Sequence, residues 1–322
     1  MKEVIVRSIS GLLFIVIMVA ALLGGVLWYS LLFGAIMVIM MLEYFRITIP
    51  KGALKWQKGA SLAVAIALFA AVLLTGYGIL EAKYLLIPAL MPLLIFIGNL
   101  YTKSFNRHTF TEQGAREPNG YENFPATLGA LLYIALPVSL FSMAALFPID
   151  ALFPIDALFP MEALFPMEAL FPMEALFPME APVEFRGGIL LGFFIILWAS
   201  DVGAYCFGCT MGRMGPRLFP SVSPKKSWIG SIGGTACAIG AAALIHSFTE
   251  LFPFSLADSL IIGALISIGG GFGDLVESQL KRNFGVKDSG SIMPGHGGML
   301  DRFDGALIGF PMAIIYLEFF LK

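Results

Sequence analysis

Long apolar segments recur along the whole chain, and each is close to the length that a helix needs to cross a lipid bilayer. A spanning helix takes about 20 apolar residues at 1.5 Å each. Residues 9–43 would make a helix of about 52 Å, too long for one crossing, so we expect two spans that meet at Gly24 and Gly25. Single spans are expected at 59–79, 84–101, 126–146, 187–207, 231–249, 256–273 and 305–321. The sequence therefore predicts an all-α polytopic integral membrane protein with about nine transmembrane helices.

The composition excludes an ordinary soluble domain. Of the 322 residues, 58% are hydrophobic and 13% are charged, whereas soluble domains carry about 25% charged residues. The formal net charge is −2, but six of the 22 acids lie in one tandem repeat, and the rest of the chain is only mildly basic, at +4. This balance gives no sign of an extended nucleic-acid surface, so we expect no nucleic-acid partner. The three cysteines lie in or beside apolar stretches and form no disulfide framework. Cys206 and Cys209 make one CxxC pair without the second pair of a zinc site.

The basic residues indicate how the chain is oriented. When lysines and arginines are sorted onto alternate sides of the nine predicted spans, 17 of the 20 fall on the side of the N-terminus. Cytoplasmic loops of membrane proteins carry an excess of lysine and arginine. The N-terminus and the polar loops at 102–125, 208–230 and 274–304 are therefore expected in the cytoplasm.

The chain divides into three predicted parts. Residues 1–125 hold N-terminal transmembrane helices and cytoplasmic loops. Residues 126–186 hold one transmembrane helix, which is followed by a loop that contains a repeat. Residues 187–322 form the C-terminal catalytic transmembrane region. In the middle part a hexapeptide, ALFPID or ALFPME, occurs six times without a break from 145 to 180. One proline per copy prevents a regular membrane helix. We expect an extracytoplasmic loop that activity does not need, with a role in ligand or partner binding as the alternative.

Polar residues are densest between residues 273 and 304. Asp274 and Glu277 are three residues apart and share a helix face, as do Asp301 and Asp304 at the entry to the last span. Carboxylates without cysteine or histidine partners suit Mg²⁺, which completes its shell with water and substrate phosphates. Close glycines allow backbone N–H groups to approach a phosphate, and basic side chains supply counter-charge. The glycines expected to do this are Gly297 and Gly298, and the basic residues are Lys281, Arg282, Lys287 and Arg302. Asp288 and His296 lie beside them in the sequence.

A second polar cluster lies on the same predicted side. Ser223, Lys225 and Lys226 lead into a glycine-rich helix start, where free N–H groups favour anions. Upstream, Asp201 interrupts an apolar run, and an acid inside a span points to a functional site. Together the two clusters predict a metal and phosphate site at the cytoplasmic face.

These residues carry a family resemblance. The run from Ser278 to Asp304 resembles the signature of the phosphatidate cytidylyltransferases, also called CDP-diacylglycerol synthases. Residues 223–227 with Gly230, Gly233 and Gly234 resemble a second family element, and Asp201 with Ala204 and Tyr205 a third. The resemblance covers residues 187–322. Ile229 stands where many members have an acid and Met293 where another aliphatic residue is usual, and the hexapeptide repeat is not a family feature.

The resemblance implies transfer of a cytidylyl group from CTP to phosphatidate with Mg²⁺, which yields CDP-diacylglycerol and pyrophosphate. It implies a bacterial inner membrane protein whose partners are CTP, phosphatidate and membrane lipids; a second cation and a homodimer are left open. The catalytic residues are then expected to be Asp274, Asp301, Lys281, Arg302 and His296. Phosphate binding is expected from Ser223, Lys225, Lys226, Arg282, Lys287, Asp288, Gly297 and Gly298. The expected metal ligands are Asp274 and Asp301, with Asp304, Glu277 and Asp201 as further candidates.

The same residues also fit structural roles. Asp301 and Asp304 could form a helix cap that pairs with neighbouring cations. The two lysines at 225 and 226 could anchor anionic lipid head groups. Asp201 could accept a hydrogen bond between helices. Two other functions remain as alternatives. A CTP-dependent lipid kinase would release CDP, and an ion-coupled transporter would use intramembrane acids, although the polar residues gather on one side and not at the midplane.

Overall fold

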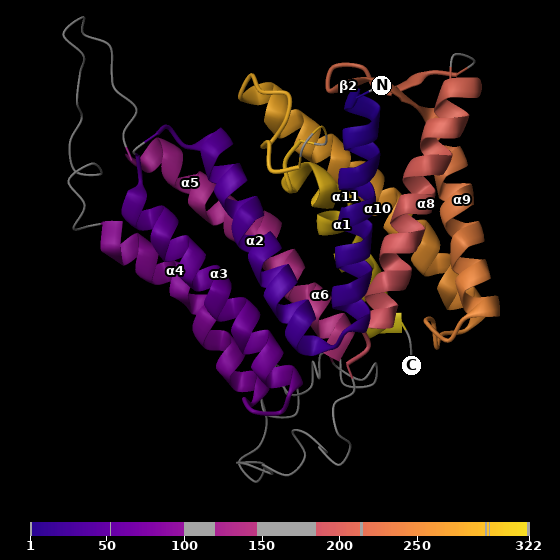
Figure 1. The fold of residues 1–322 in the computed structure, drawn as a ribbon. Helices are drawn as coiled ribbons and strands as arrows, with labels where there is room; N and C mark the ends of the chain where they lie inside the picture. Colours follow the sequence, from indigo (N-terminus) through magenta and orange to yellow (C-terminus); the bar gives the residue numbers. More distant parts are fainter. Residues whose placement is uncertain are drawn as a thin grey trace, which may run out of the picture.

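The fold is a set of long helices with one small hairpin (Figure 1). The computed structural model describes residues 2–51, 53–99, 120–146, 185–212, 215–293, 295 and 297–320. The first group of helices is α1 (Lys2–Leu23), α2 (Val26–Thr48), α3 (Lys55–Gly76), η1 (Ala82–Leu85), α4 (Leu86–Asn99), α5 (Gly120–Ala130), the π-helical η3 (Leu131–Ala135) and α6 (Leu136–Leu146). The second group is α8 (Gly187–Thr210), α9 (Trp228–Phe248), α10 (Leu256–Asn283) and α11 (Leu300–Phe320), with strands β1 (Arg217–Phe219) and β2 (Ser223–Ser227) between α8 and α9.

The helices confirm the membrane class. Within the described residues, six helices are long and apolar enough to cross a bilayer, at Val26–Thr48, Lys55–Gly76, Phe124–Leu146, Gly187–Thr210, Trp228–Phe248 and Leu256–Asn283. Two shorter apolar helices occupy Arg7–Leu23 and Lys83–Asn99. Among the described residues, each predicted span overlaps a helix, whereas the total of nine crossings stays a prediction. The antiparallel hairpin of β1 and β2 is an addition to the expected all-α fold.

The predicted break in the first apolar segment is confirmed. Helix α1 ends at Leu23 and α2 begins at Val26. Gly25 between them has a φ of 99°, in the left-handed region that glycine reaches without a Cβ clash. The chain therefore turns back here and forms two antiparallel helices from one apolar run.

Two predicted segments begin or end differently from the expectation. The loop expected at 102–125 contains the start of a helix, because α5 begins at Gly120; residues 102–119 lie outside the described part of the chain. The first repeat copy does not begin as a loop, since Ala145 and Leu146 are buried residues of α6. The first two residues of this copy are apolar, so they can extend the preceding helix although they belong to the repeat. The rest of the repeat, 147–180, lies outside the described residues.

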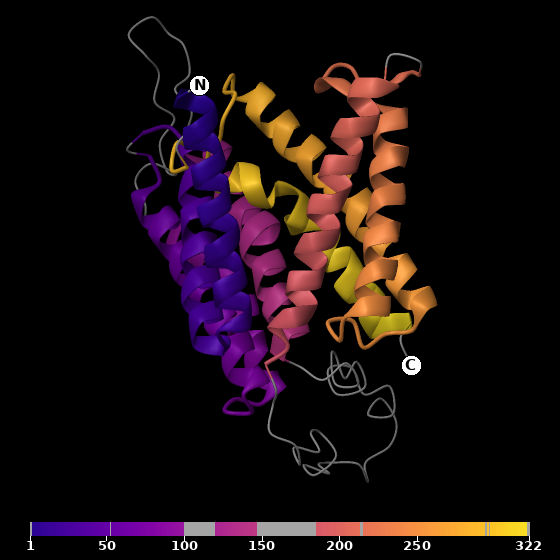
Figure 2. The ribbon, with the colours of Figure 1, turned by 45° about the vertical axis from the view of Figure 1, so that its right-hand side comes forward.

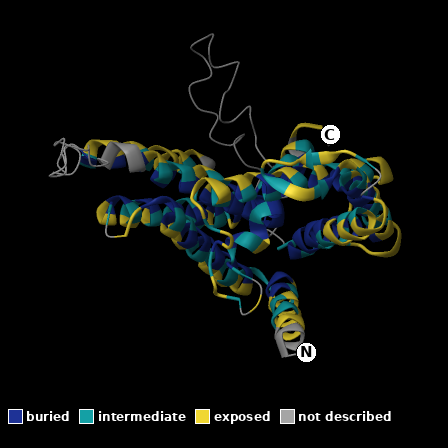
Figure 3. Cartoon of the chain, turned by 90° about the horizontal axis from the view of Figure 1, so that it is seen from above, coloured by how far each residue is buried: buried dark blue, intermediate teal, exposed yellow. Residues whose placement is uncertain are grey.

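The helices form two groups that meet at α11. Figures 1 and 2 show α1 to α6 in one group and α8, α9 and α10 in the other, with α11 between them. The N-terminus, the hairpin and the end of α10 lie at one end of the helices, and the C-terminus lies at the other. Seen from above, buried residues face the neighbouring helices and exposed residues cover the outer surfaces (Figure 3). The described residues of the predicted polar loops at 208–230 and 274–304 thus lie toward the same end of the helices.

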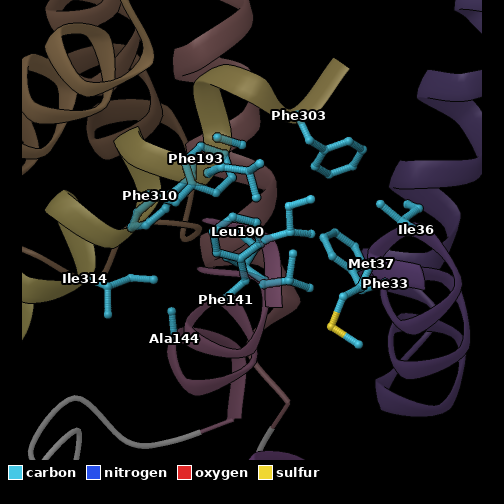
Figure 4. Close-up of a cluster of buried hydrophobic side chains, with 14 of the residues drawn as sticks. Phe33, Ile36, Met37, Phe141, Ala144, Leu190, Phe193, Phe303, Phe310 and Ile314 are labelled. Atoms are coloured by element: carbon cyan, nitrogen blue, oxygen red, sulfur yellow. The ribbon is translucent and has the colours of Figure 1, made fainter. Parts of the chain in front are cut away.

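Aromatic side chains hold α11 between the two groups. Figure 4 shows buried side chains of α2, α6, α8 and α11 in one cluster. Phe303 of α11 lies edge-on to Phe33 of α2, with ring centroids 6.2 Å apart, and to Phe194 of α8 at 5.7 Å. Phe310 packs on Phe141 of α6 at 5.1 Å. Each such pair contributes about 0.5–1.5 kcal/mol beyond its buried area, so α11 is fixed against both groups.

Candidate functional site

The hairpin carries two of the predicted lysines. Lys225 and Lys226 lie on β2, and the strand ends at Ser227, whose hydroxyl accepts a hydrogen bond of 3.2 Å from the backbone N–H of Gly230. Ser227 is thus the N-cap of α9, a position at which serine satisfies a free helix donor. The cap places both lysines beside the start of the glycine-rich helix, as the sequence predicted.

Asp201, Asp274 and Asp304 come from three different helices and line one cavity of about 690 Å³. α8 supplies the first acid, α10 the second and α11 the third. Asp274 and Asp201 are both close enough to Asp304 to interact with it electrostatically. The remaining charged residues of the lining are Arg217, Lys225, Lys226, Asp301 and Arg302. The structure therefore brings together residues that lie up to about a hundred positions apart, with both signs of charge on one wall.

Ion pairing inside the cavity joins the hairpin to α10. Lys226 Nζ lies 2.7 Å from Oδ2 of Asp274 and donates to the backbone carbonyl of Gly271 at 3.4 Å. The hydroxyl of Ser278 donates to Oδ1 of Asp274 at 3.1 Å. The side chain of Asp274 remains 44% exposed and that of Lys226 28%. Both partners are therefore accessible to a ligand that exchanges for the ion pair.

Hydroxyl groups form a further polar patch of the lining. Ser200 on α8 and Ser267 on α10 are hydrogen-bonded at 2.7 Å, and both line the cavity. Thr235 of α9 lies 3.0 Å from the same Ser267 hydroxyl. These contacts tie three helices together beside the charged wall. Apolar side chains complete the lining, among them Leu197, Trp198 and Leu218.

Lys281 and Glu277 are not on the cavity wall but behind it. Lys281 forms ion pairs with Glu277 and with Oδ1 of Asp301, the latter at 2.5 Å. Glu277 is fully buried. The sequence predicts that Asp274 and Glu277 share one helix face. The structure pairs Asp274 with Lys226 and Glu277 with Lys281, so the two acids take different partners. Lys281 positions carboxylates here and does not line the cavity itself.

Asp301 is held by the loop that precedes α11. Its Oδ2 accepts hydrogen bonds from the backbone N–H of Ser289 at 3.0 Å, from the Ser289 hydroxyl at 2.9 Å and from the N–H of Gly298 at 2.8 Å. Burial favours the protonated acid, but the Lys281 ammonium and the hydrogen bonds from Gly298 and Ser289 hold the pKa of Asp301 at about 2. Asp301 is therefore an ionised, well-fixed carboxylate at neutral pH. The structural cap that the sequence left as an alternative is present for this residue.

The other predicted phosphate-binding residues lie away from the cavity lining. Arg282 is exposed in the last turn of α10, and Lys287 and Asp288 are exposed on the segment that follows this helix. Ser223 begins β2, and Gly298 is buried against the Ser289 hydroxyl. Gly297, with a φ of 86°, pairs with Met293 in an isolated β-bridge. His296 lies outside the described residues.

Two residues of the region were missed from the sequence. Arg217 lines the cavity and donates a hydrogen bond of 3.2 Å to the backbone carbonyl of Lys225. Glu43 of α2 is 7% exposed and accepts hydrogen bonds from the loop before α11. Arg217 belongs to no sequence motif that would have indicated a site. Glu43 could have been found from the sequence, because it is an acid within the apolar sequence MMLEYF.

The donor set fits a hard cation that also binds substrate. Among the described residues, no three carboxylate, imidazole or thiol groups lie close enough together to hold an ion by themselves. Mg²⁺ is usually held by one or two carboxylates, with substrate phosphates and water as the other ligands. Asp274 and Asp304 supply such a pair on one wall. Cys206, Cys209 and Cys237 are free thiols.

Comparisons with known proteins agree with this chemistry. A family model described as the cytidylyltransferase family matches residues 5–320. Proteins named phosphatidate cytidylyltransferase from Staphylococcus saprophyticus, Staphylococcus haemolyticus and Staphylococcus aureus are each 44% identical to this chain over 128 residues. The match covers 40% of this chain and 48% of each relative. The chain thus spans about half the length of the curated relatives it matches.

Proposed function

The chain belongs to the cytidylyltransferase family, and on this premise we propose that it transfers the cytidylyl group of CTP to phosphatidate. The observation that carries the proposal is the cavity, in which acids of three helices face lysines of the hairpin. The names of the relatives supply the substrates. CDP-diacylglycerol and pyrophosphate are the products.

The proposed reaction is a substitution at phosphorus. A phosphate oxygen of phosphatidate attacks the α-phosphorus of CTP, the bond from that phosphorus to the bridging oxygen breaks, and pyrophosphate leaves with the electron pair. An ionised phosphate oxygen needs no strong base, so positioning and charge neutralisation are what the protein must supply. Lys226 leaves Asp274 for a phosphate in this proposal, and Lys225 and Arg302 hold the remaining negative charge.

Mg²⁺ is proposed as the cofactor, with Asp274 and Asp304 as its ligands and Asp201 beside them. The bound ion would neutralise charge on the phosphates of CTP. Asp301 and Glu277 remain candidate ligands, and a second cation is left open. The two carboxylates come from neighbouring helices whose packing fixes their separation, so this chain's own contribution is a rigid pair of oxygen donors.

The cavity is proposed to face the cytoplasm in a bacterial inner membrane. The bias of lysine and arginine toward the N-terminal side supports this orientation. The cavity is lined by the hairpin, by the middle of α10 around Gly270 and Asp274, by the start of α11 and by parts of α8 and α9. The hairpin lies at the end of the helices that carries the N-terminus (Figure 1). CTP would then enter from water and phosphatidate from the surrounding lipid.

The proposal is tested with CTP labelled at the α-phosphate and phosphatidate in detergent micelles, with and without Mg²⁺. The proteins are wild type, Asp274→Asn and the control Glu250→Gln, which changes an exposed acid in the loop between α9 and α10. We expect label in the lipid only with Mg²⁺, a loss of at least about 100-fold in Asp274→Asn, and wild-type activity in Glu250→Gln.

Other outcomes identify the alternatives. Label that stays in water-soluble CDP while the lipid gains unlabelled phosphate would replace the proposal with a lipid kinase. No turnover by folded wild-type protein would reject both enzymes and return transport to consideration.

A further inference from the structure

A carboxylate from the first helix group reaches the loop that builds the site. Glu43 lies in the last two turns of α2. Its Oε1 accepts a hydrogen bond of 3.0 Å from the backbone N–H of Met299, and its Oε2 accepts one of 2.8 Å from the N–H of Leu300. These are the free donors at the start of α11, a place where an acid is stabilising. Glu43 thus caps α11 from a helix more than 250 positions away in the sequence.

The surrounding loop is shaped to receive this carboxylate. A Cβ on Gly290 would lie 2.2 Å from Oε1 of Glu43, and a Cβ on Gly298 would lie 2.6 Å from Oε2 and 2.6 Å from the backbone nitrogen of Gly290. Any side chain at these two positions would therefore collide with Glu43 or with the loop itself. The glycines that the sequence assigned to phosphate approach include one, Gly298, that makes room for a buried acid.

One hydroxyl connects Glu43 to the predicted catalytic acid. The oxygen of Ser289 lies 3.3 Å from Oε2 of Glu43 and 2.9 Å from Oδ2 of Asp301. The backbone N–H of Asp301 also donates to this hydroxyl, at 3.3 Å. Glu43 therefore contacts the site in two ways, through the first residues of α11 and through the serine that holds Asp301.

We propose that Glu43 is a positioning residue, whose carboxylate sets the described loop residues around Ser289 and Met299 and the start of α11, so that Asp301 and Asp304 take their places in the site. This inference rests on the proposed function. The buried carboxylate accepts from two backbone N–H groups, one on each oxygen, whereas an amide offers one acceptor oxygen and adds two N–H donors. The charge as well as the shape of Glu43 is needed.

The test compares Glu43→Gln with Thr48→Val in micelles. Thr48 is a matched control, because it is a buried polar residue of the same helix whose hydroxyl donates to the carbonyl of Tyr44 within α2. For each protein we measure kcat and KM for CTP, and hydrogen exchange of backbone amides by mass spectrometry. Glu43→Gln is expected to lower kcat about 10- to 100-fold with KM within about threefold. Exchange of the segment 289–303 should become on the order of tenfold faster while α8 and α9 keep wild-type exchange.

Each alternative result has a defined meaning. Wild-type kcat in Glu43→Gln, or a lower kcat with unchanged exchange at 289–303, would overturn the proposal. Faster exchange throughout the protein, with the same loss in Thr48→Val, would reduce Glu43 to a general stabilising role and overturn it too. If Glu43→Gln does not fold, the same measurements are made on Glu43→Asp, which keeps the carboxylate but shortens the side chain. If wild type transfers no cytidylyl group, the proposed function fails, and the exchange data still decide whether Glu43 holds the loop.

Discussion

Asp301 and Asp274 are both predicted metal ligands, yet the structure gives their oxygens different surroundings. A carboxylate has about four acceptor sites. Those of Asp301 meet Lys281, the Gly298 N–H and both donors of Ser289. Asp274 has one ion pair and one hydroxyl, and its side chain is 44% exposed. These surroundings favour Asp274 as the acid that exchanges its present partners for a ligand, and Asp301 as the acid that holds the loop.

Asp301→Asn is expected to lower kcat by about 100-fold, because one amide oxygen cannot accept all four hydrogen bonds and Lys281 loses a counter-charge. We expect the Mg²⁺ concentration for half-maximal activity to stay within about twofold of wild type. The same titration on Asp274→Asn should require a higher concentration. A raised Mg²⁺ requirement in Asp301→Asn would restore Asp301 as a ligand.

Residue types were more predictable than their partners. The sequence indicated Asp201, Asp274, Asp304 and Lys226, because charged side chains within or beside apolar runs are costly unless they serve a site. It did not predict that Lys281 turns away from the cavity, since both faces of α10 carry acids and only the packing of α11 decides between them. Glu43 also interrupts an apolar run, but the sequence did not connect it to the site, because its partners are backbone groups of a distant loop.

The close approach of α10 and α11 sets the separation of the acids. A Cβ on Gly273 would lie 2.1 Å from the backbone carbonyl oxygen of Asp304 and 2.9 Å from the Cα of Gly305. Both contacts are with backbone, which cannot move aside without shifting a helix. Small residues at such contacts allow membrane helices to pack closely. Asp274 follows Gly273 directly, so the same contact fixes one acid relative to the other.

Gly273→Ala is therefore expected to push α11 away from α10 and to destabilise the protein by roughly 1–3 kcal/mol. Activity should fall by at least about tenfold, because the two carboxylates separate. Gly240→Ala is the control, since a Cβ there meets nothing within 4 Å on α9. Thermal unfolding in detergent and the transfer assay check both. Equal melting temperatures for Gly273→Ala and wild type would contradict the packing argument.

Helices were predicted better than the hairpin for a physical reason. Apolar length decides where a membrane helix lies, and the break at Gly25 follows from glycine at positive φ. The strand at Ser223–Ser227 has the sequence SPKKS, which lacks the alternation of apolar and polar residues that marks a strand. Its pairing with β1 comes from the short connection and from the cap at Ser227.

The site depends on both helix groups. Phe33 of α2 packs on Phe303 of α11, and Glu43 of the same helix caps α11. The family match likewise extends over both groups, from residue 5 to 320. The apolar N-terminal helices are therefore part of the structure that positions the acids, although the motifs of the sequence lie in residues 187–322.

The repeat joins these groups through ends that lie side by side. The backbone N–H of Arg186 donates to the carbonyl of Ala145 at 2.6 Å, so a short turn is long enough to connect Leu146 to Phe185. Replacing residues 147–184 with a four-residue Gly/Ser linker shortens the connection about tenfold, which lowers the entropy cost of loop closure by roughly 2 kcal/mol. The deletion starts at 147 because the two residues before it belong to α6.

We expect this deletion variant to insert, to melt no lower than wild type and to keep kcat within about twofold, because the contacts of the cavity come from α8 to α11 and the hairpin. A second variant with a Gly/Ser linker of the original length separates the sequence of the repeat from its length. Loss of activity in both variants, with normal insertion and melting, would give the repeat a role in binding or catalysis. Loss in the short variant alone would mean that the two helix groups need a longer connection to reach their positions.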